Sequence, residues 1–211
     1  MSIERRPLKT RSTQWAQATA RWLAQSGITP NQISLLSILM SLLSMVSFFY
    51  SHQNPLLLLV AALFIQLRLA CNLFDGMVAV EHHKKSRLGD IFNDAPDRLA
   101  DVFIIMGAAL ASTPQPYAIH LGWAASILAV LTAYIRVLGS SLGTPSFFVG
   151  PMAKPHRMAL LTVAAICEFV FKIGSFSLPF LYWALIVMVV GTVVTNFRRL
   201  FKIKNFLEQS Q

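Results

Sequence analysis

Long apolar runs alternate with short polar segments along the chain. The runs cover about residues 32–50, from 56 into the 70s, 96–111, 117–138, 158–172 and 178–195, and few charged residues interrupt them. A helix needs roughly 17–25 such residues to cross the hydrocarbon core of a membrane. The pattern therefore predicts an all-α, polytopic membrane protein with six transmembrane helices.

An amphipathic stretch over about residues 10–26 precedes the first of these helices. Its two tryptophans fall on one helical side and most of its polar residues on the others, which is typical of a helix that lies in the membrane interface. A disordered basic arm is the alternative. Gly27 ends the stretch, and Thr29 followed by Pro30 predicts the cap and the first turn of the next helix.

Composition and charge fit a single membrane domain over residues 1–211, with a six-helix core at about 30–197 and a basic cytoplasmic tail at 198–211. Hydrophobic residues make up 55% of the chain, charged residues only 13%, and the mean hydropathy is +0.57. Sixteen of the 18 Lys and Arg residues fall on one side of this layout, which the positive-inside rule makes the cytoplasmic side, and both termini lie there. The net charge of +9 fits a bilayer with anionic lipid, and no basic stripe with interleaved aromatic residues indicates nucleic acid.

Acidic residues gather at one place, at the end of the second apolar run and just after it. Five of the nine Asp and Glu residues are Asp75, Asp90, Asp94, Asp97 and Asp101. Carboxylates at membrane depth are costly unless they are paired or bind cations, and hard divalent ions prefer oxygen ligands. Asp75 and Asp97 are the stronger candidates for a metal site. The other three are better explained as acids that cap a helix or favour its dipole.

Helical spacing groups these acids with other polar residues. Arg68, Asn72, Asp75 and Ala79 are spaced by four, three and four, so they share one face of the second helix. The acids at 90–101 fall within about 100° of arc if a helix runs through them. The two acidic faces are therefore expected to meet near the cytoplasmic surface of the membrane.

The spacing resembles the signature of the CDP-alcohol phosphatidyltransferase family of integral membrane enzymes, D-x2-D-G-x2-A-R-x8-G-x3-D-x3-D. All eight fixed positions of the signature are in register, five with the signature residue and three changed: Asn72, Asp75-Gly76, Ala79-Val80, Gly89, Asn93 and Asp97. The resemblance implies a phosphotransferase of phospholipid biosynthesis. Such an enzyme uses Mg²⁺ or Mn²⁺ to move a phosphatidyl group from a CDP-linked lipid to a small alcohol, and CMP leaves.

The resemblance also implies roles for individual residues. Asp97 matches the general base that acts on the acceptor hydroxyl and is also a metal neighbour, and Asp75 matches a metal-binding aspartate. Gly76, Ala79 and Gly89 match the small residues that make room for the cytidine nucleotide.

Three positions depart from the signature. Asn72 and Asn93 stand where the family has metal-binding aspartates, so they keep an amide oxygen for a metal but lose two negative charges. Asp94 or Asp90 is a candidate for the missing charge. Val80 replaces the signature arginine, which leaves the pyrophosphate of the nucleotide to another cation.

Basic residues on the cytoplasmic side are the candidates for phosphate binding. Arg68, or a cation of the 84–87 loop, is expected to pair with the pyrophosphate. Arg136, Lys154 and Arg157 resemble the family region that receives a phosphorylated acceptor. These three residues also fit ordinary positive charge beside cytoplasmic helix ends, and both interpretations stay open.

The whole pattern predicts an enzyme of the bacterial inner membrane with its active site toward the cytoplasm. Its expected partners are a CDP-diacylglycerol-type donor, a small alcohol or sugar-phosphate acceptor, the lipid bilayer and, by family resemblance, a second copy in a homodimer. A catalytically impaired relative that binds lipid or acts as a scaffold is the first alternative. A small transporter, with Arg68 and Asp75 along its path, is the second.

Overall fold

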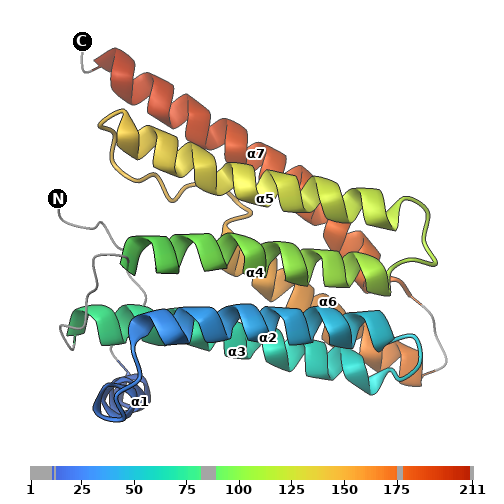
Figure 1. Cartoon of the computed structure of the whole chain (residues 1–211). Coiled ribbons are helices and arrows are strands. Elements are labelled where there is room, and N and C mark those ends of the chain that lie inside the picture. The colour runs from blue at the N-terminus through green and yellow to red at the C-terminus, as the bar shows by residue number, and fades with distance from the viewer. Residues whose placement is uncertain (1–10, 12, 82–88, 175–177, 210–211) are drawn as a thin grey trace.

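The computed structural model describes residues 11, 13–81, 89–174 and 178–209, and every regular element in this part of the chain is a helix (Figure 1). The elements are α1 (Gln14–Gln25), α2 (Pro30–Tyr50), α3 (Leu56–Glu81), α4 (Gly89–Ala111), α5 (Ala118–Ser141), α6 (Lys154–Ile173) and α7 (Phe180–Gln209). Helices α2 to α7 pack into one bundle, and α1 lies at one end of it in a different direction (Figure 1). The predicted all-α architecture is confirmed.

Four of the described helices are long and apolar enough to cross a membrane: α2, α3, α5 and α7. Helices α4 and α6 belong to the same bundle, but each carries several charged residues along its length. These charges point to the functional site, because several of them pair with one another inside the bundle.

Two helix boundaries differ from the prediction. Helix α4 begins at Gly89, about two turns before the expected start near Pro96, because Pro96 removes one backbone donor without ending the helix. Helix α7 continues to Gln209, so most of the predicted basic tail is helical. At about 1.5 Å per residue the 30 residues of α7 span about 45 Å, more than the roughly 30 Å of a hydrocarbon core.

The turn between α1 and α2 confirms the predicted start of the first long helix. Gly27 has a φ of 79°, a left-handed conformation that glycine adopts without steric cost. Thr29 and Gln32 then form a capping box, in which Gln32 N–H donates to Thr29 Oγ1 at 3.3 Å and Thr29 N–H donates to Gln32 Oε1 at 2.9 Å. Pro30 occupies the first turn, as expected.

Helix α1 is tied to the end of the bundle through α3. Its buried face, Ala16 and Ala20, packs against Leu73 and Met77 of α3. Its two tryptophans, Trp15 and Trp22, are each more than half exposed. A helix with small buried residues on one side and exposed indole rings on the other fits the interfacial position that the sequence predicts.

Small side chains let α2 and α4 approach closely. A Cβ atom at Gly107 of α4 would lie 2.7 Å from Met45 Cα of α2, nearer than two such atoms can pack. On α2 the serines Ser34, Ser37, Ser41 and Ser44 are all buried. This contact places the first turns of α2 beside the charged parts of α3 and α4.

Candidate active site

Asp75 lies near the C-terminal end of α3 and is 4% exposed. One of its oxygens, Oδ2, accepts a hydrogen bond of 2.8 Å from Ser34 Oγ of α2. The other, Oδ1, is buried and accepts no hydrogen bond among the described residues. The first turn of α2 therefore anchors one oxygen of this carboxylate, and the other oxygen is buried without a hydrogen-bond donor among the described residues.

Asp97 lies where α3, α4 and α6 come together. Lys154 Nζ, from the first turn of α6, is 2.5 Å from Asp97 Oδ2. Asn72 Nδ2 donates to Asp97 Oδ1 at 2.5 Å, and Arg68 Nη2 is 3.4 Å from the same oxygen. The structure thus brings together four of the predicted site residues, and the Asp97 side chain keeps 14% of its surface exposed.

Asp101, one turn further along α4, forms the centre of a buried charged group that the sequence interpretation missed. Its Oδ1 lies 2.7 Å from Arg68 Nη2, and its Oδ2 lies 2.5 Å from Arg157 Nη2. Arg157 also donates to Met152 O at 3.0 Å. The exposed fractions of these three residues are 0% to 1%, so the prediction of a capping role for Asp101 is wrong.

The burial of Arg68 and Arg157 alters what these two residues can do. Both were expected to reach phosphate groups, Arg68 on the nucleotide and Arg157 on the acceptor. Their guanidinium groups are instead enclosed, and Asp101 binds both of them. We therefore treat both arginines as residues that position α3, α4 and α6 around Asp97. The position of Arg68 within an apolar run was the feature of the sequence that could have indicated this buried group, because a buried charge requires a partner of opposite charge.

Asp94 and Arg136 form a second ion pair nearer the surface of the bundle. Asp94 Oδ1 lies 2.7 Å from Arg98 Nη2 and 2.8 Å from Arg136 Nη2. Asp94 was a candidate for the charge lost at the asparagines, but two guanidinium groups already bind it. Arg136 is 28% exposed in its side chain and lies over the ring of Phe148, 5.9 Å from its centroid.

The remaining motif positions are described in part. Gly76, Ala79 and Gly89 are partly exposed, and Val80 is 44% exposed. Asn93 and Asp90 belong to α4, but their side chains lie outside the described part of the chain, as do the cations of the 84–87 loop. The expected roles of these residues stay predictions.

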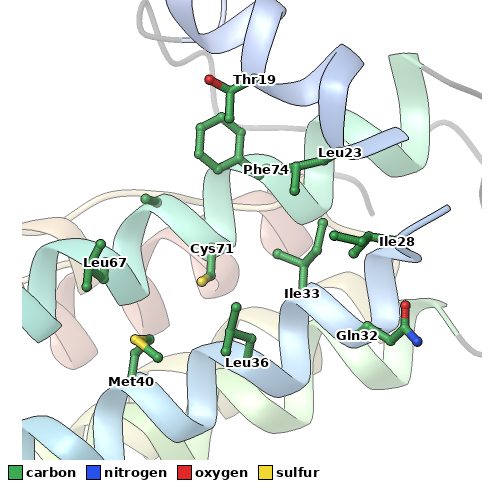
Figure 2. A pocket seen from close by; sticks show the side chains of 11 residues that line it. Thr19, Leu23, Ile28, Gln32, Ile33, Leu36, Met40, Leu67, Cys71 and Phe74 are labelled. Atoms are coloured by element: carbon green, nitrogen blue, oxygen red, sulfur yellow. The ribbon is translucent and has the colours of Figure 1, made fainter. Parts of the chain in front are cut away.

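An apolar pocket of about 630 Å³ lies between α1, α2 and α3. Figure 2 shows Leu23 of α1, Ile33, Leu36 and Met40 of α2, and Cys71 of α3 pointing toward it. Cys71 and Phe74, which line the pocket, precede Asp75 by one turn and by one residue, so the pocket reaches the part of α3 that carries this carboxylate.

Comparison with known proteins identifies the family. A sequence profile of the CDP-alcohol phosphatidyltransferases matches residues 27–195. The chain belongs to this family. It is therefore a transferase of phospholipid synthesis, and its family is metal-dependent. The transporter alternative finds no support in this match.

Similar proteins agree with this assignment. The phosphatidyltransferase is 25% identical to archaetidylinositol phosphate synthase of Pyrococcus horikoshii over 190 residues, 88% of this chain and 89% of that protein. It is 27% identical to inner membrane protein YnbA of Escherichia coli over 139 residues, 66% and 67% of the two chains. These relatives and the four apolar helices indicate an integral membrane protein.

Two solved structures share its fold. Phosphatidylinositol phosphate synthase PgsA1 of Mycobacterium tuberculosis with CDP-DAG bound has a TM-score of 0.75 at 19% identity, covering 90% of this chain and 94% of that one. The same enzyme with manganese and citrate has a TM-score of 0.73, also at 19% identity, with coverage of 89% and 88%.

The donor set of the phosphatidyltransferase fits a divalent cation. The buried Oδ1 of Asp75, which accepts no hydrogen bond among the described residues, is the oxygen that a hard cation would bind. Within the described residues no group of three or more His, Cys, Asp or Glu side chains is arranged to hold a metal. Because asparagine stands at two signature positions, amide oxygens would have to supplement the carboxylates in such a site.

Proposed function

We propose that this phosphatidyltransferase moves the phosphatidyl group of a CDP-diacylglycerol-type donor to the hydroxyl of a small alcohol and releases CMP. The position of Asp97 is the observation that carries the proposal. Two helices, α3 and α6, supply donors to its carboxylate, whose side chain is 14% exposed and lies near Asp75. A carboxylate that is fixed in orientation and open on one side can take the proton of an alcohol.

The reaction couples one bond made to one bond broken. The acceptor oxygen attacks the phosphatidyl phosphorus, its proton passes to Asp97, and the bond from that phosphorus to the CMP oxygen breaks. Asn72 and Lys154 hold the orientation of Asp97 during this step. Asp75, with the amide oxygens of Asn72 and Asn93 as further candidate ligands, would hold the divalent cation, Mg²⁺ or Mn²⁺, which neutralises phosphoryl oxygens.

A phosphorylated acceptor fits the basic residues that remain partly exposed. Lys154 and Arg136 expose 22% and 28% of their side chains, whereas Arg157 exposes 1%. We assign the acceptor phosphate to Lys154 and Arg136 and exclude Arg157 from direct contact. The names of two relatives support a polyol phosphate as the acceptor, since both proteins are synthases of inositol phosphate lipids.

The apolar pocket fits the lipid part of the donor. Its lining is almost entirely hydrophobic, and it lies between the membrane helices α2 and α3 and the interfacial helix α1 (Figure 2). An acyl chain in this pocket would keep the phosphate end of the donor near Asp75, about one helical turn from Cys71.

The arrangement in the membrane is part of the same proposal. We expect α2 to α7 to form the six transmembrane segments, with the ion pairs of α4 and α6 hidden inside the bundle. The active site and both termini then face the cytoplasm of a bacterial inner membrane, because sixteen of the 18 cationic side chains gather at that side. A homodimer is the expected assembly.

The deciding assay is CMP release by purified protein supplied with CDP-diacylglycerol, Mg²⁺ or Mn²⁺, and a panel of alcohols and polyol phosphates. We expect CMP with at least one acceptor. Asp97→Asn should abolish turnover while donor binding persists, because the amide cannot take the proton. Glu208→Gln is the matched control, since Glu208 forms an exposed ion pair with Lys204 near the end of α7, away from Asp97. No CMP with any acceptor would instead support the impaired, lipid-binding relative.

A further inference from the structure

The two carboxylates of the active site differ in what already binds them. Each oxygen of Asp97 accepts from a nitrogen donor: Oδ1 from Asn72 and Arg68, Oδ2 from Lys154. Asp75 accepts from the Ser34 hydroxyl and has no ion pair with a Lys or Arg side chain among the described residues, and its buried Oδ1 accepts no hydrogen bond there. A divalent cation can therefore use Asp75 without displacing a protein cation, which is not true of Asp97.

A cation that approached Asp97 would meet a like charge first. The Lys154 ammonium is 2.5 Å from Oδ2, and the Arg68 guanidinium is 3.4 Å from Oδ1. Repulsion between unit charges at such distances is large where the surroundings exclude water, and Arg68 has no exposed surface. The geometry thus offers one place for a divalent ion and opposes a second.

The charge balance leads to the same number of ions. Ion pairs connect Asp97 and Asp101 with Arg68, Lys154 and Arg157, so this group carries one positive charge in excess, and the charge of Asp75 beside it makes the total neutral. A diphosphate diester brings two negative charges, which one divalent ion offsets completely. In the complex with the donor alone, before the acceptor phosphate binds, a second ion would leave two positive charges in excess, which is costly in a buried site.

We propose that the site holds a single divalent cation on Asp75, and that Lys154 supplies at Asp97 the positive charge that a second cation would otherwise bring. The charge balance rests on the proposed diphosphate donor, whereas the contacts of Asp75 and Asp97 do not depend on it. Lys154 then has two tasks, since it also binds the acceptor phosphate.

Counting bound Mn²⁺ on the full chain tests the proposal without turnover. Protein in nanodiscs of zwitterionic lipid is titrated with Mn²⁺ in the absence of acceptor, once without and once with CDP-diacylglycerol, and free Mn²⁺ is followed by electron paramagnetic resonance. We expect wild type to bind one ion more than Asp75→Asn, with no spin-coupled Mn²⁺ pair. Asp75→Glu, which keeps the carboxylate, should retain the ion. Three results would overturn the proposal. Wild type could bind two ions more than Asp75→Asn, it could show a spin-coupled Mn²⁺ pair, or wild type and Asp75→Asn could bind equal numbers of ions.

A gain of binding tests the part played by Lys154. The double variant Asn72→Asp/Lys154→Gln removes two hydrogen-bond donors from Asp97 and puts side-chain oxygens, which can bind a metal ion, in their place. We expect this variant to bind a second Mn²⁺. The matched control Lys204→Gln/Glu208→Gln alters an exposed ion pair on α7 and should still bind one. A count that stays at one in a correctly folded Asn72→Asp/Lys154→Gln variant would show that Lys154 does not take the place of a cation.

The outcomes separate this proposal from the proposed function. If the protein binds one Mn²⁺ on Asp75 but never releases CMP, the single-ion site is supported and the proposed reaction is refuted. If the protein releases CMP and binds two ions, the proposed reaction is supported and the single-ion site is refuted.

Discussion

Replacing Asp101 by asparagine removes the charge that holds two buried guanidinium groups. Asp101 is 1% exposed and lies 2.7 Å from Arg68 and 2.5 Å from Arg157, which are 0% and 1% exposed. Removing one partner of a buried ion pair costs about 3–5 kcal/mol, because the remaining charge stays buried and uncompensated. Asparagine keeps the shape and one oxygen acceptor, so we expect a loss near the lower end, about 3 kcal/mol.

The predicted loss corresponds to a measurable fall in the melting temperature. For a chain of this size 1 kcal/mol shifts Tm by about 2–4 °C, so Asp101→Asn should lower Tm by roughly 6–12 °C. Thermal unfolding in detergent, followed by intrinsic tryptophan fluorescence, measures the shift. Glu208→Gln, in an ion pair whose side chains are more than 60% exposed, should change Tm by no more than about 2 °C.

Replacing the whole charged group separates its net contribution from the cost of breaking it. Arg68→Met/Asp101→Leu/Arg157→Met removes all three charges of this group, and such apolar replacements are often neutral or stabilising. We expect its Tm to lie well above that of Asp101→Asn. The argument from buried charge is refuted if the Tm of Asp101→Asn lies within about 2 °C of the wild-type Tm. It is also refuted if the triple variant melts at a lower temperature than Asp101→Asn.

Two further predictions concern packing. Gly107→Val should destabilise the bundle by about 1–3 kcal/mol, because its Cβ would lie 2.7 Å from Met45 Cα. Thermal unfolding measures this loss, and Ala159→Val, at an exposed position of α6, is the control. Cys71→Phe should fill part of the apolar pocket and raise KM for a long-chain donor about tenfold relative to a short-chain donor, with kcat unchanged. Cys167→Phe, outside the pocket, is the control, and equal effects of the two substitutions on KM would contradict an acyl-chain site.

The pattern along the chain determines the helices and part of the site. Long apolar runs must form helices in a membrane, because every backbone polar group needs an internal partner. Thr29 and Pro30 define the start of α2 because their chemistry is local. The spacing of Asn72 and Asp75 places them on one face of α3, since that relation depends only on the helical period.

Only the tertiary structure decides which charges meet. A buried carboxylate must find a partner, but the sequence offers 18 cationic side chains and gives no order of preference among them. Arg157 joins Asp101 across 56 residues, and Ser34 joins Asp75 across 41, because helix packing brings these turns together. Local spacing therefore identifies Asp75 and Asp97 as candidates. The packing of α2, α3, α4 and α6 determines that both oxygens of Asp97 accept from nitrogen donors, whereas Asp75 has an oxygen left for a cation.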